Sequence, residues 1–398
     1  MQESRNNELA QGIAPESIGH VVPLPLKKDF KGWHKPRKQW VRREQWCKET
    51  RSLLEKLRLD GRPLRYLSLP GEDMLDIRVL AALCTELNQN LKCLGFDESI
   101  GKRSDRAEVN ISRNEISNCI EPTSVIRADN ISVLKSTTSQ GFKYVKELGP
   151  FDVINLDLCG SLSCVDCPDN HQALKNLCEF QVNESREPWL LFLTTRAESQ
   201  QVNLEHLPRY LEILKKNTDN LPCFGDRFTQ LTGFDMRSYR ETDDKQKLID
   251  VIDGAGFVRL FAAGIGKWLL QLVLKSKISW EVNMLDSCWY RVEDNQTSDS
   301  FPNMLSLAFL FSPTGIALID SSGLASSNPA QETDEGSLAM GILEKTENLT
   351  DLDVKVDLDG VLHDELVRES ADLMKAARYE RDPYVEWANR KRIRFEAC

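Results

Sequence analysis

The stretch FDVINLDLCG, from Phe151 to Gly160, indicates the fold class of this chain. It follows the turn residues Gly149-Pro150 and runs through apolar residues that suit a buried strand. It then ends in polar or small residues, among them Asn155 and Asp157. In an open parallel sheet, ligands bind outside the carboxyl ends of the strands. Asn155 and Asp157 are therefore candidate site residues, although Asp157 could equally cap the element that follows.

Strand and helix patterns alternate on both sides of this stretch. The predicted strands lie at 64–69, 91–96, 124–128, 152–156 and 189–194, and the predicted helices between them at 73–87, 104–120, 139–147 and 170–182. Such alternation is typical of a parallel sheet built from right-handed crossovers. The predicted fold class is therefore α/β, with a doubly wound, mostly parallel sheet.

The pattern changes after residue 196. Helices are predicted at 204–217, 245–252 and 264–275, an antiparallel edge hairpin at 280–292 and 304–311, a linker at 321–335, and closing helices at 360–378 and 382–392. This divides the chain into a basic leader and helix (1–60), an α/β domain (61–320, core 61–200) and a linker with C-terminal helices (321–398). The basic and aromatic C-terminal helices are expected to pack on the fold or to bind a protein partner.

Composition limits the class of protein. The 398 residues are 41% hydrophobic and 28% charged, as in ordinary globular proteins. No uninterrupted apolar run reaches the roughly 18 residues that span a bilayer, and the polar N-terminus has no signal-peptide core. We therefore expect a cytoplasmic protein with no membrane partner. Eleven cysteines, an odd number, favour reduced thiols. The net charge of −10 argues against a uniformly basic surface but allows a local basic patch.

The segment Lys27–Arg51 is such a patch, with ten basic and only three acidic residues. Trp33, Trp40 and Trp46 are interleaved with the cations. Cations neutralise phosphates and aromatic rings stack on unpaired bases, which predicts RNA or DNA binding. Alternatively, 36–57 is an amphipathic helix whose tryptophans pack on a core while its charges face solvent.

The order of residues at the strand ends resembles a known family. These residues are Pro70-Gly71, Asp97, Asp129-Asn130 and the run from Asn155 to Gly160. The order is similar to that of class I S-adenosylmethionine-dependent methyltransferases, and the nearest pattern is the tRNA guanine-26 dimethyltransferase. That protein's fourth strand resembles FDVINLDLCGSL. The resemblance covers about 64–195 and implies a Rossmann-like sheet, with 280–311 supplying its sixth and seventh strands.

The resemblance also implies a cofactor, S-adenosylmethionine, and a role for each strand end. Pro70-Gly71 would approach the methionine moiety of the cofactor, and Asp97 would accept hydrogen bonds from the ribose hydroxyls. Asp129-Asn130 would lie at the adenine. Asp157, with Asn155 nearby, would face the methyl acceptor and accept a hydrogen bond from an exocyclic amine.

Two departures from the family pattern leave two functions open. Ser68 stands where an acid is common, and Leu158 and Cys159 replace a proline and a phenylalanine. The first candidate is a methyltransferase acting on nucleic acid. The second is a catalytically inactive methyltransferase-like subunit of a multi-protein complex, of the kind found in bacterial anti-phage defence.

One cluster of cysteines has some of the residues of a metal site. Cys159, Cys164, Cys167, His171 and Cys178 lie within twenty residues and include one CxxC pair. A tetrahedral zinc site needs four ligands, and no second CxxC pair is present. We therefore predict no metal, with most cysteines as scattered core residues.

Overall fold

The computed structural model describes residues 26–392 apart from several gaps. The gaps are 58, 102–105, 165–167, 200–201, 203–205, 238, 240–251, 253, 277, 293–301 and 316–333. Nearly all of the predicted leader, helix 245–252 and linker 321–335 lie outside the described residues, as does Cys167.

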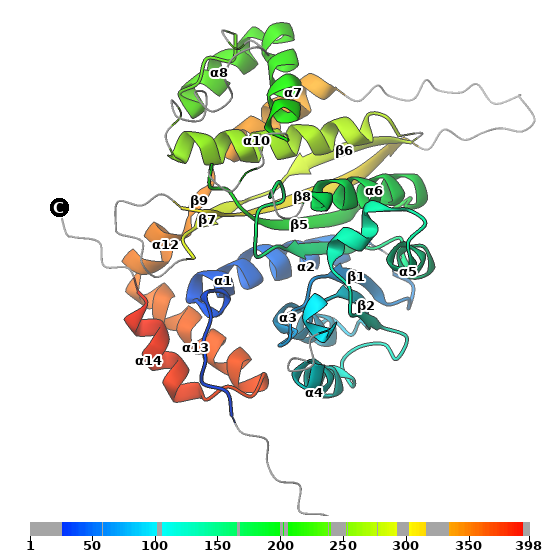
Figure 1. Cartoon of the computed structure of the whole chain (residues 1–398), viewed down its shortest axis with the longest axis vertical. Helices are drawn as coiled ribbons and strands as arrows, with labels where there is room; N and C mark the ends of the chain where they lie inside the picture. Colours follow the sequence, from blue (N-terminus) through cyan, green and yellow to red (C-terminus); the bar gives the residue numbers. More distant parts are fainter. Residues whose placement is uncertain are drawn as a thin grey trace, which may run out of the picture.

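A mixed nine-stranded sheet forms the centre of the described structure (Figure 1). Its strands are β1 (Leu64–Ser68), β2 (Leu91–Phe96), β3 (Val125–Arg127), β4 (Val153–Asp157), β5 (Trp189–Arg196), β6 (Ser279–Met284), β7 (Cys288–Tyr290), β8 (Met304–Gly315) and β9 (Thr350–Asp351). The order is β3-β2-β1-β4-β5-β8-β7-β9, with β6 also paired to β8. Strands β1 to β5 are parallel, so the predicted α/β class with a mostly parallel sheet is confirmed.

The predicted edge hairpin differs from the structure in two ways. The strand expected at 280–292 is broken into β6 and β7, and the Ser287 hydroxyl between them accepts a hydrogen bond from Ala308 N at 3.1 Å. Strand β8 lies inside the sheet, because it pairs antiparallel with β5 on one side and with β6 and β7 on the other. It is buried from Met304 to Phe309. Strand β9 extends the sheet beyond β7, so residues past the expected domain boundary at 320 belong to it.

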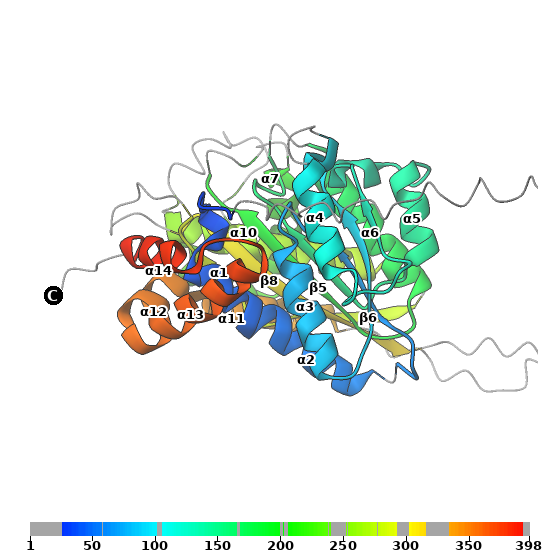
Figure 2. The same cartoon turned by 90° about the horizontal axis from the view of Figure 1, so that it is seen from below.

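Helices cover both faces of the sheet (Figures 1 and 2). They are α1 (Pro36–Trp40), α2 (Lys48–Lys56), α3 (Leu75–Glu86), α4 (Arg106–Ile116), α5 (Gln140–Leu148), α6 (Asp169–Glu184), α7 (Leu207–Asn220), α8 (Pro222–Thr232), α10 (Gly254–Val273), α11 (Glu335–Glu347), α12 (Leu352–Leu358), α13 (Gly360–Ala376) and α14 (Arg381–Arg390). The two faces alternate along β5: Trp189, Leu191 and Leu193 join one core, whereas Leu190 and Phe192 join the other.

The N-terminal helix runs from α1 through the π-helical segment η2 (Val41–Cys47) into α2. Trp40 and Trp46 are buried as predicted, and Lys48, Glu55 and Lys56 are exposed as expected, but the first two turns depart from the expectation that the charges face solvent. Arg37, Lys38 and Arg42 are all buried. The reason is that the helix is enclosed between the sheet and the C-terminal helices (Figure 2), where carboxylates pair with two of these cations.

Helix α10 is longer than the segment predicted at 264–275. Among the described residues, it is the one helix that is long and apolar enough to cross a membrane by length and composition. Within the fold, 89% of its apolar window is buried, so the helix serves here as a core element packed against β6 and α7.

Candidate functional site

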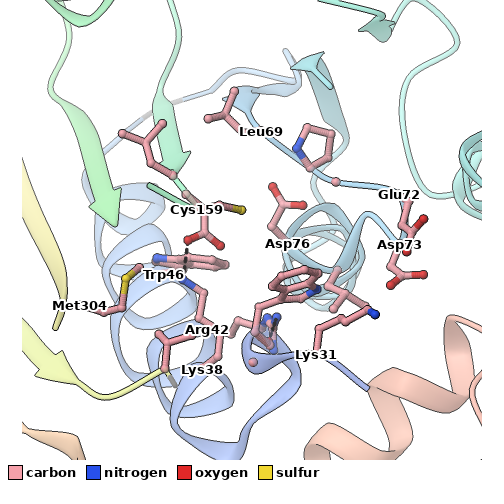
Figure 3. Close-up of a pocket in the computed structure, with 18 of the residues that line it drawn as sticks. Lys31, Lys38, Arg42, Trp46, Leu69, Glu72, Asp73, Asp76, Cys159 and Met304 are labelled. Carbon is pink, nitrogen blue, oxygen red and sulfur yellow. Dashed lines mark hydrogen bonds and ion pairs between the residues drawn. The ribbon is translucent and has the colours of Figure 1, made fainter. Parts of the chain in front are cut away.

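A pocket of about 440 Å³ lies at the carboxyl ends of the parallel strands (Figure 3). Pro70-Gly71 follows β1, Asp97 follows β2, Asp157 ends β4 and Arg196 ends β5, and all of them line it. The structure therefore brings together four of the residues predicted from the strand ends, namely Pro70, Gly71, Asp97 and Asp157. The pocket lies beside the pair β1 and β4, where the strand order reverses and where ligands bind in open α/β sheets.

The opposite wall comes from the N-terminal helix, which sequence reasoning did not assign to the site. Lys38, Arg42 and Trp46 line the pocket, together with Trp33 and with Tyr290 of β7. The spacing of residues 38, 42 and 46 places their side chains on one helical face, and this spacing is the feature of the sequence that could have grouped them. The spacing alone does not predict that this helical face packs against the carboxyl ends of the strands.

Lys38 makes an ion pair with Asp157, the acid that the sequence predicts to face the methyl acceptor. Its ammonium donates to Asp157 Oδ1 at 2.7 Å, to Thr194 Oγ1 at 3.2 Å and to Tyr290 Oη at 3.4 Å. Burial lowers the pKa of Lys38, and the charge of Asp157 opposes that shift. An ammonium has three N–H donors, and each has an acceptor here. Asp157 is thus held in place through one oxygen.

Two buried groups in the pocket wall have unused hydrogen-bonding atoms. Arg42 donates through Nη2 to the Trp33 carbonyl at 3.1 Å, but its Nε and Nη1 have no hydrogen-bond partner among the described residues. Asp76 accepts from Tyr66 Oη at 2.7 Å through Oδ2, whereas its buried Oδ1 has no such partner there. Burial raises the pKa of Asp76, and hydrogen bonding from Tyr66, from the Ser68 side chain and from the Ile77 backbone opposes that shift. Leaving such groups unsatisfied costs about 1–3 kcal/mol or more each, so these atoms are available to water or to a ligand in the pocket.

Three residues predicted for the site lie elsewhere. Asn155 is buried behind the pocket wall, where its Nδ2 donates to Tyr66 Oη at 3.0 Å. Asp129 pairs with Arg127 at 3.1 Å. Asn130 accepts from Ser132 N at 3.0 Å and caps the short helix that follows. None of the three belongs to the part of the pocket wall that the described residues form.

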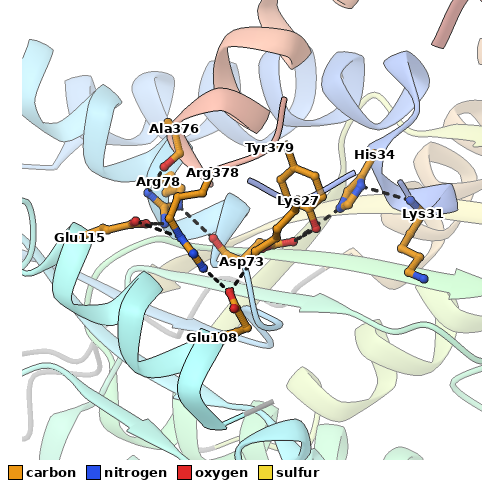
Figure 4. A network of polar contacts seen from close by, with 10 residues as sticks. All are labelled: Lys27, Lys31, His34, Asp73, Arg78, Glu108, Glu115, Ala376, Arg378 and Tyr379. Atoms are coloured by element: carbon orange, nitrogen blue, oxygen red, sulfur yellow. Dashed lines mark hydrogen bonds and ion pairs between the residues drawn. The ribbon is translucent and has the colours of Figure 1, made fainter. Parts of the chain in front are cut away.

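The loop after β1 is anchored by a polar network centred on Asp73 (Figure 4). Lys27 Nζ lies 2.5 Å from Asp73 Oδ1, and Tyr379 Oη donates to Oδ2 at 2.8 Å. The imidazole of His34 accepts from Lys31 N through Nδ1 and places Nε2 3.6 Å from the same carboxylate. Burial alone would raise the pKa of Asp73, but these contacts outweigh it and lower the pKa to about 2.

The thiols near β4 do not converge. Cys159, Cys164 and Cys178 are free thiols, with Cys159 exposed at the pocket and Cys178 buried under the sheet. Within the described ranges, no group of three or more metal-binding side chains is found.

A family of related sequences includes this chain. The chain is a member of the PP_RS20740-like family, whose model matches residues 27–389. The match includes the N-terminal helix, the sheet and the C-terminal helices, and therefore both walls of the pocket. A search of curated proteins found no match.

The Asp73 network predicts a pH-dependent contribution to stability. Because the folded-state pKa is below the ordinary value of 3.8, the contribution is present above that value and is lost as the pH falls toward 2. In urea unfolding, Asp73→Asn should lower the unfolding free energy by about 2 kcal/mol at pH 6, and the difference from wild type should shrink below pH 4. The exposed Asp382→Asn should change it by less than about 0.5 kcal/mol. An Asp73→Asn deficit that is constant with pH would contradict the assignment.

Proposed function

We propose that this protein binds S-adenosylmethionine in the strand-end pocket and transfers its methyl group. The observation that carries the proposal is the convergence of Gly71, Asp97 and Asp157 on one pocket with the unsatisfied groups of Arg42 and Asp76. The strand order supports it, because the parallel order β3-β2-β1-β4-β5 continues into the antiparallel strand β8, and β6 and β8 come largely from the segment 280–311 in which the resemblance places the sixth and seventh strands.

The free hydrogen-bonding atoms fit an amino-acid moiety. A guanidinium with unused N–H donors suits a carboxylate, and a carboxylate oxygen without a partner suits an ammonium group. Arg42 and Asp76 offer these groups from facing walls of the pocket (Figure 3). Asp76 also supplies, from the first turn of α3, the acid that Ser68 lacks at the end of β1. The departure at Ser68 is therefore compatible with cofactor binding.

The remaining groups suit a nucleoside. Asp97 follows β2 in the pocket wall, where a carboxylate can accept hydrogen bonds from two ribose hydroxyls. Gly71 has φ +63°, a left-handed conformation that glycine adopts without strain, and it shapes the loop into the pocket.

S-adenosylmethionine, when bound, supplies an electrophilic methyl group. The contribution of this chain is to hold and orient two reactants, which can provide much of the rate. Asp157 ends β4 in the pocket wall, with one oxygen bonded to Lys38, so its other oxygen is the candidate hydrogen-bond acceptor for the methyl acceptor's N–H. Lys38 acts as a positioning residue because it fixes the acid.

A second candidate is a binding subunit without turnover. Lys38 already engages Asp157, and the neighbouring Leu158 and Cys159 provide no ring beside it. Leu358 and Val361, at the junction of α12 and α13, are 63% and 80% exposed and offer apolar contacts to a protein partner. Partner binding through the C-terminal helices would then replace catalysis as the function.

Titration calorimetry tests cofactor binding. The wild-type chain should bind S-adenosylmethionine at one site, and Asp97→Ala should weaken binding at least about tenfold through loss of the ribose contacts. Asp129→Asn is the matched control, because Asp129 also follows a strand but lies outside the pocket wall, and it should bind within about twofold of wild type. No heat from the wild type, together with no shift in its Tm, would refute the proposal.

Transfer of labelled methyl groups separates the two candidates. With single-stranded RNA or DNA as the acceptor, Asp157→Asn should reduce transfer by about a hundredfold or more while leaving cofactor binding intact, because the amide keeps an oxygen for Lys38 but replaces the other acceptor oxygen with an NH2 donor. If the wild type binds the cofactor, transfers nothing and co-purifies with a stoichiometric protein, the non-catalytic subunit is the correct reading.

A further inference from the structure

Trp33 presents an exposed aromatic ring at the pocket. It lines the cavity, yet its side chain is 46% exposed. Of the large apolar side chains that the structure describes as exposed, it is the only aromatic one. The other tryptophan in this wall, Trp46, is 1% exposed and packs in the core beneath Lys38. Scattered exposed aliphatic residues need no explanation, but an indole ring held open at a ligand pocket is a candidate contact.

The backbone of Trp33 and of its two neighbours in the sequence is fixed by three contacts. The Trp33 carbonyl accepts from buried Arg42 at 3.1 Å. The preceding Gly32 packs so closely on Val292 that an added Cβ would lie 2.8 Å from its Cγ1. The following residue, His34, is buried, and its carbonyl accepts from Tyr384 Oη at 2.6 Å. The ring is therefore presented from a fixed backbone, and little ordering is needed when a ligand binds.

The surroundings of the ring combine aromatic and cationic groups. Lys31, whose side chain is 43% exposed, and Arg196 line the same pocket. The ion pair of Lys31 with Asp29 is at the surface and contributes little, so Lys31 can exchange it for another anion. Other cations of the 27–51 segment, such as Arg37, are buried in ion pairs. The accessible part of the segment thus suits one stacked base with its phosphate better than a long backbone track.

We infer that Trp33 is the stacking surface for the methyl acceptor, and that the acceptor is a planar nucleobase of an unpaired nucleotide. The base stacks on the Trp33 ring with its exocyclic amine toward Asp157, and Lys31 and Arg196 lie where its phosphate can be neutralised. Trp33 thereby supplies the ring that Leu158 and Cys159 do not. The inference rests on the proposed function for the transfer step, but base binding can be measured separately.

The test compares binding of a labelled single-stranded oligonucleotide of about ten nucleotides, as RNA and as DNA, by fluorescence anisotropy. Trp33→Ala should weaken binding roughly five- to a hundredfold, the loss expected for one base–aromatic stack, whereas Trp33→Phe should stay within about threefold of wild type. Leu274→Ala, an exposed apolar residue directly after α10 and outside the pocket lining, is the control and should have no effect. The same oligonucleotide as a duplex should bind more weakly. In methyl transfer, Trp33→Ala should raise KM more than it lowers kcat.

Equal binding by wild type and Trp33→Ala would overturn the inference, as would failure of Trp33→Phe to restore binding or no wild-type binding of either oligonucleotide. Binding of S-adenosylmethionine, measured in the same variants, should be unchanged by Trp33→Ala. If the wild type binds the oligonucleotide in a Trp33-dependent way but not the cofactor, the proposed methyl transfer fails and the stacking site stands.

Discussion

A buried cation has to be paired with an anion or fully hydrogen-bonded, and the N-terminal helix buries three of them. Arg37 meets Asp353 and Asp357 of α12, and Lys38 meets Asp157 at the end of β4. Arg42 has a carbonyl on one N–H and no partner within the described residues for its Nε and Nη1. The same requirement therefore attaches the helix to the C-terminal region and to the sheet, and it leaves two N–H donors of the pocket-lining Arg42 without a partner among the described residues.

These ion pairs also join the three parts into which the sequence divides the chain. Without the acids of α12, Arg37 would be an uncompensated charge between the helix and the sheet. Without the helix, the carboxyl ends of the strands would have no second wall and the pocket would be open. The loop after β1 is held similarly, because Asp73 binds Lys27 from the N-terminal segment and Tyr379 from the C-terminal region. The strand-end pocket, the N-terminal helix and the C-terminal helices are thus connected by direct contacts.

The parallel strands could be predicted from the sequence because each is a short apolar run with turn residues at its ends. All five lie within two residues of their predicted limits. The convergence of Asp97 and Asp157 followed from the rule that parallel strand ends share one edge. Asn155 was misplaced for a reason visible in the strand itself. It lies on the same face as Asp157 but two residues earlier, about 7 Å deeper in the sheet.

Other parts of the site depended on tertiary structure. The local sequence of a basic helix does not show whether its charges face solvent or pair with distant acids. Arg37 pairs with Asp353 and Asp357, which lie more than 300 residues later in the chain. The resemblance places Asp129 and Asn130 at the adenine, but Asp129 pairs with Arg127 and Asn130 accepts from Ser132 N. Short polar side chains often bond to groups close to them in the sequence. Asp76 lies within the helix predicted at 73–87, and only the packing of α3 under β1 shows that its carboxylate bonds to Tyr66 of β1 and lines the pocket.

We propose that the strand-end pocket recognises the amino-acid and ribose parts of one ligand through Arg42, Asp76 and Asp97. The most direct measurement is a crystal structure of the full chain with S-adenosylhomocysteine. The account predicts the ligand carboxylate on Arg42, its amino group on Asp76 and its ribose hydroxyls on Asp97. An empty pocket at saturating ligand, or a ligand bound with Arg42 and Asp76 still unpartnered, would contradict it.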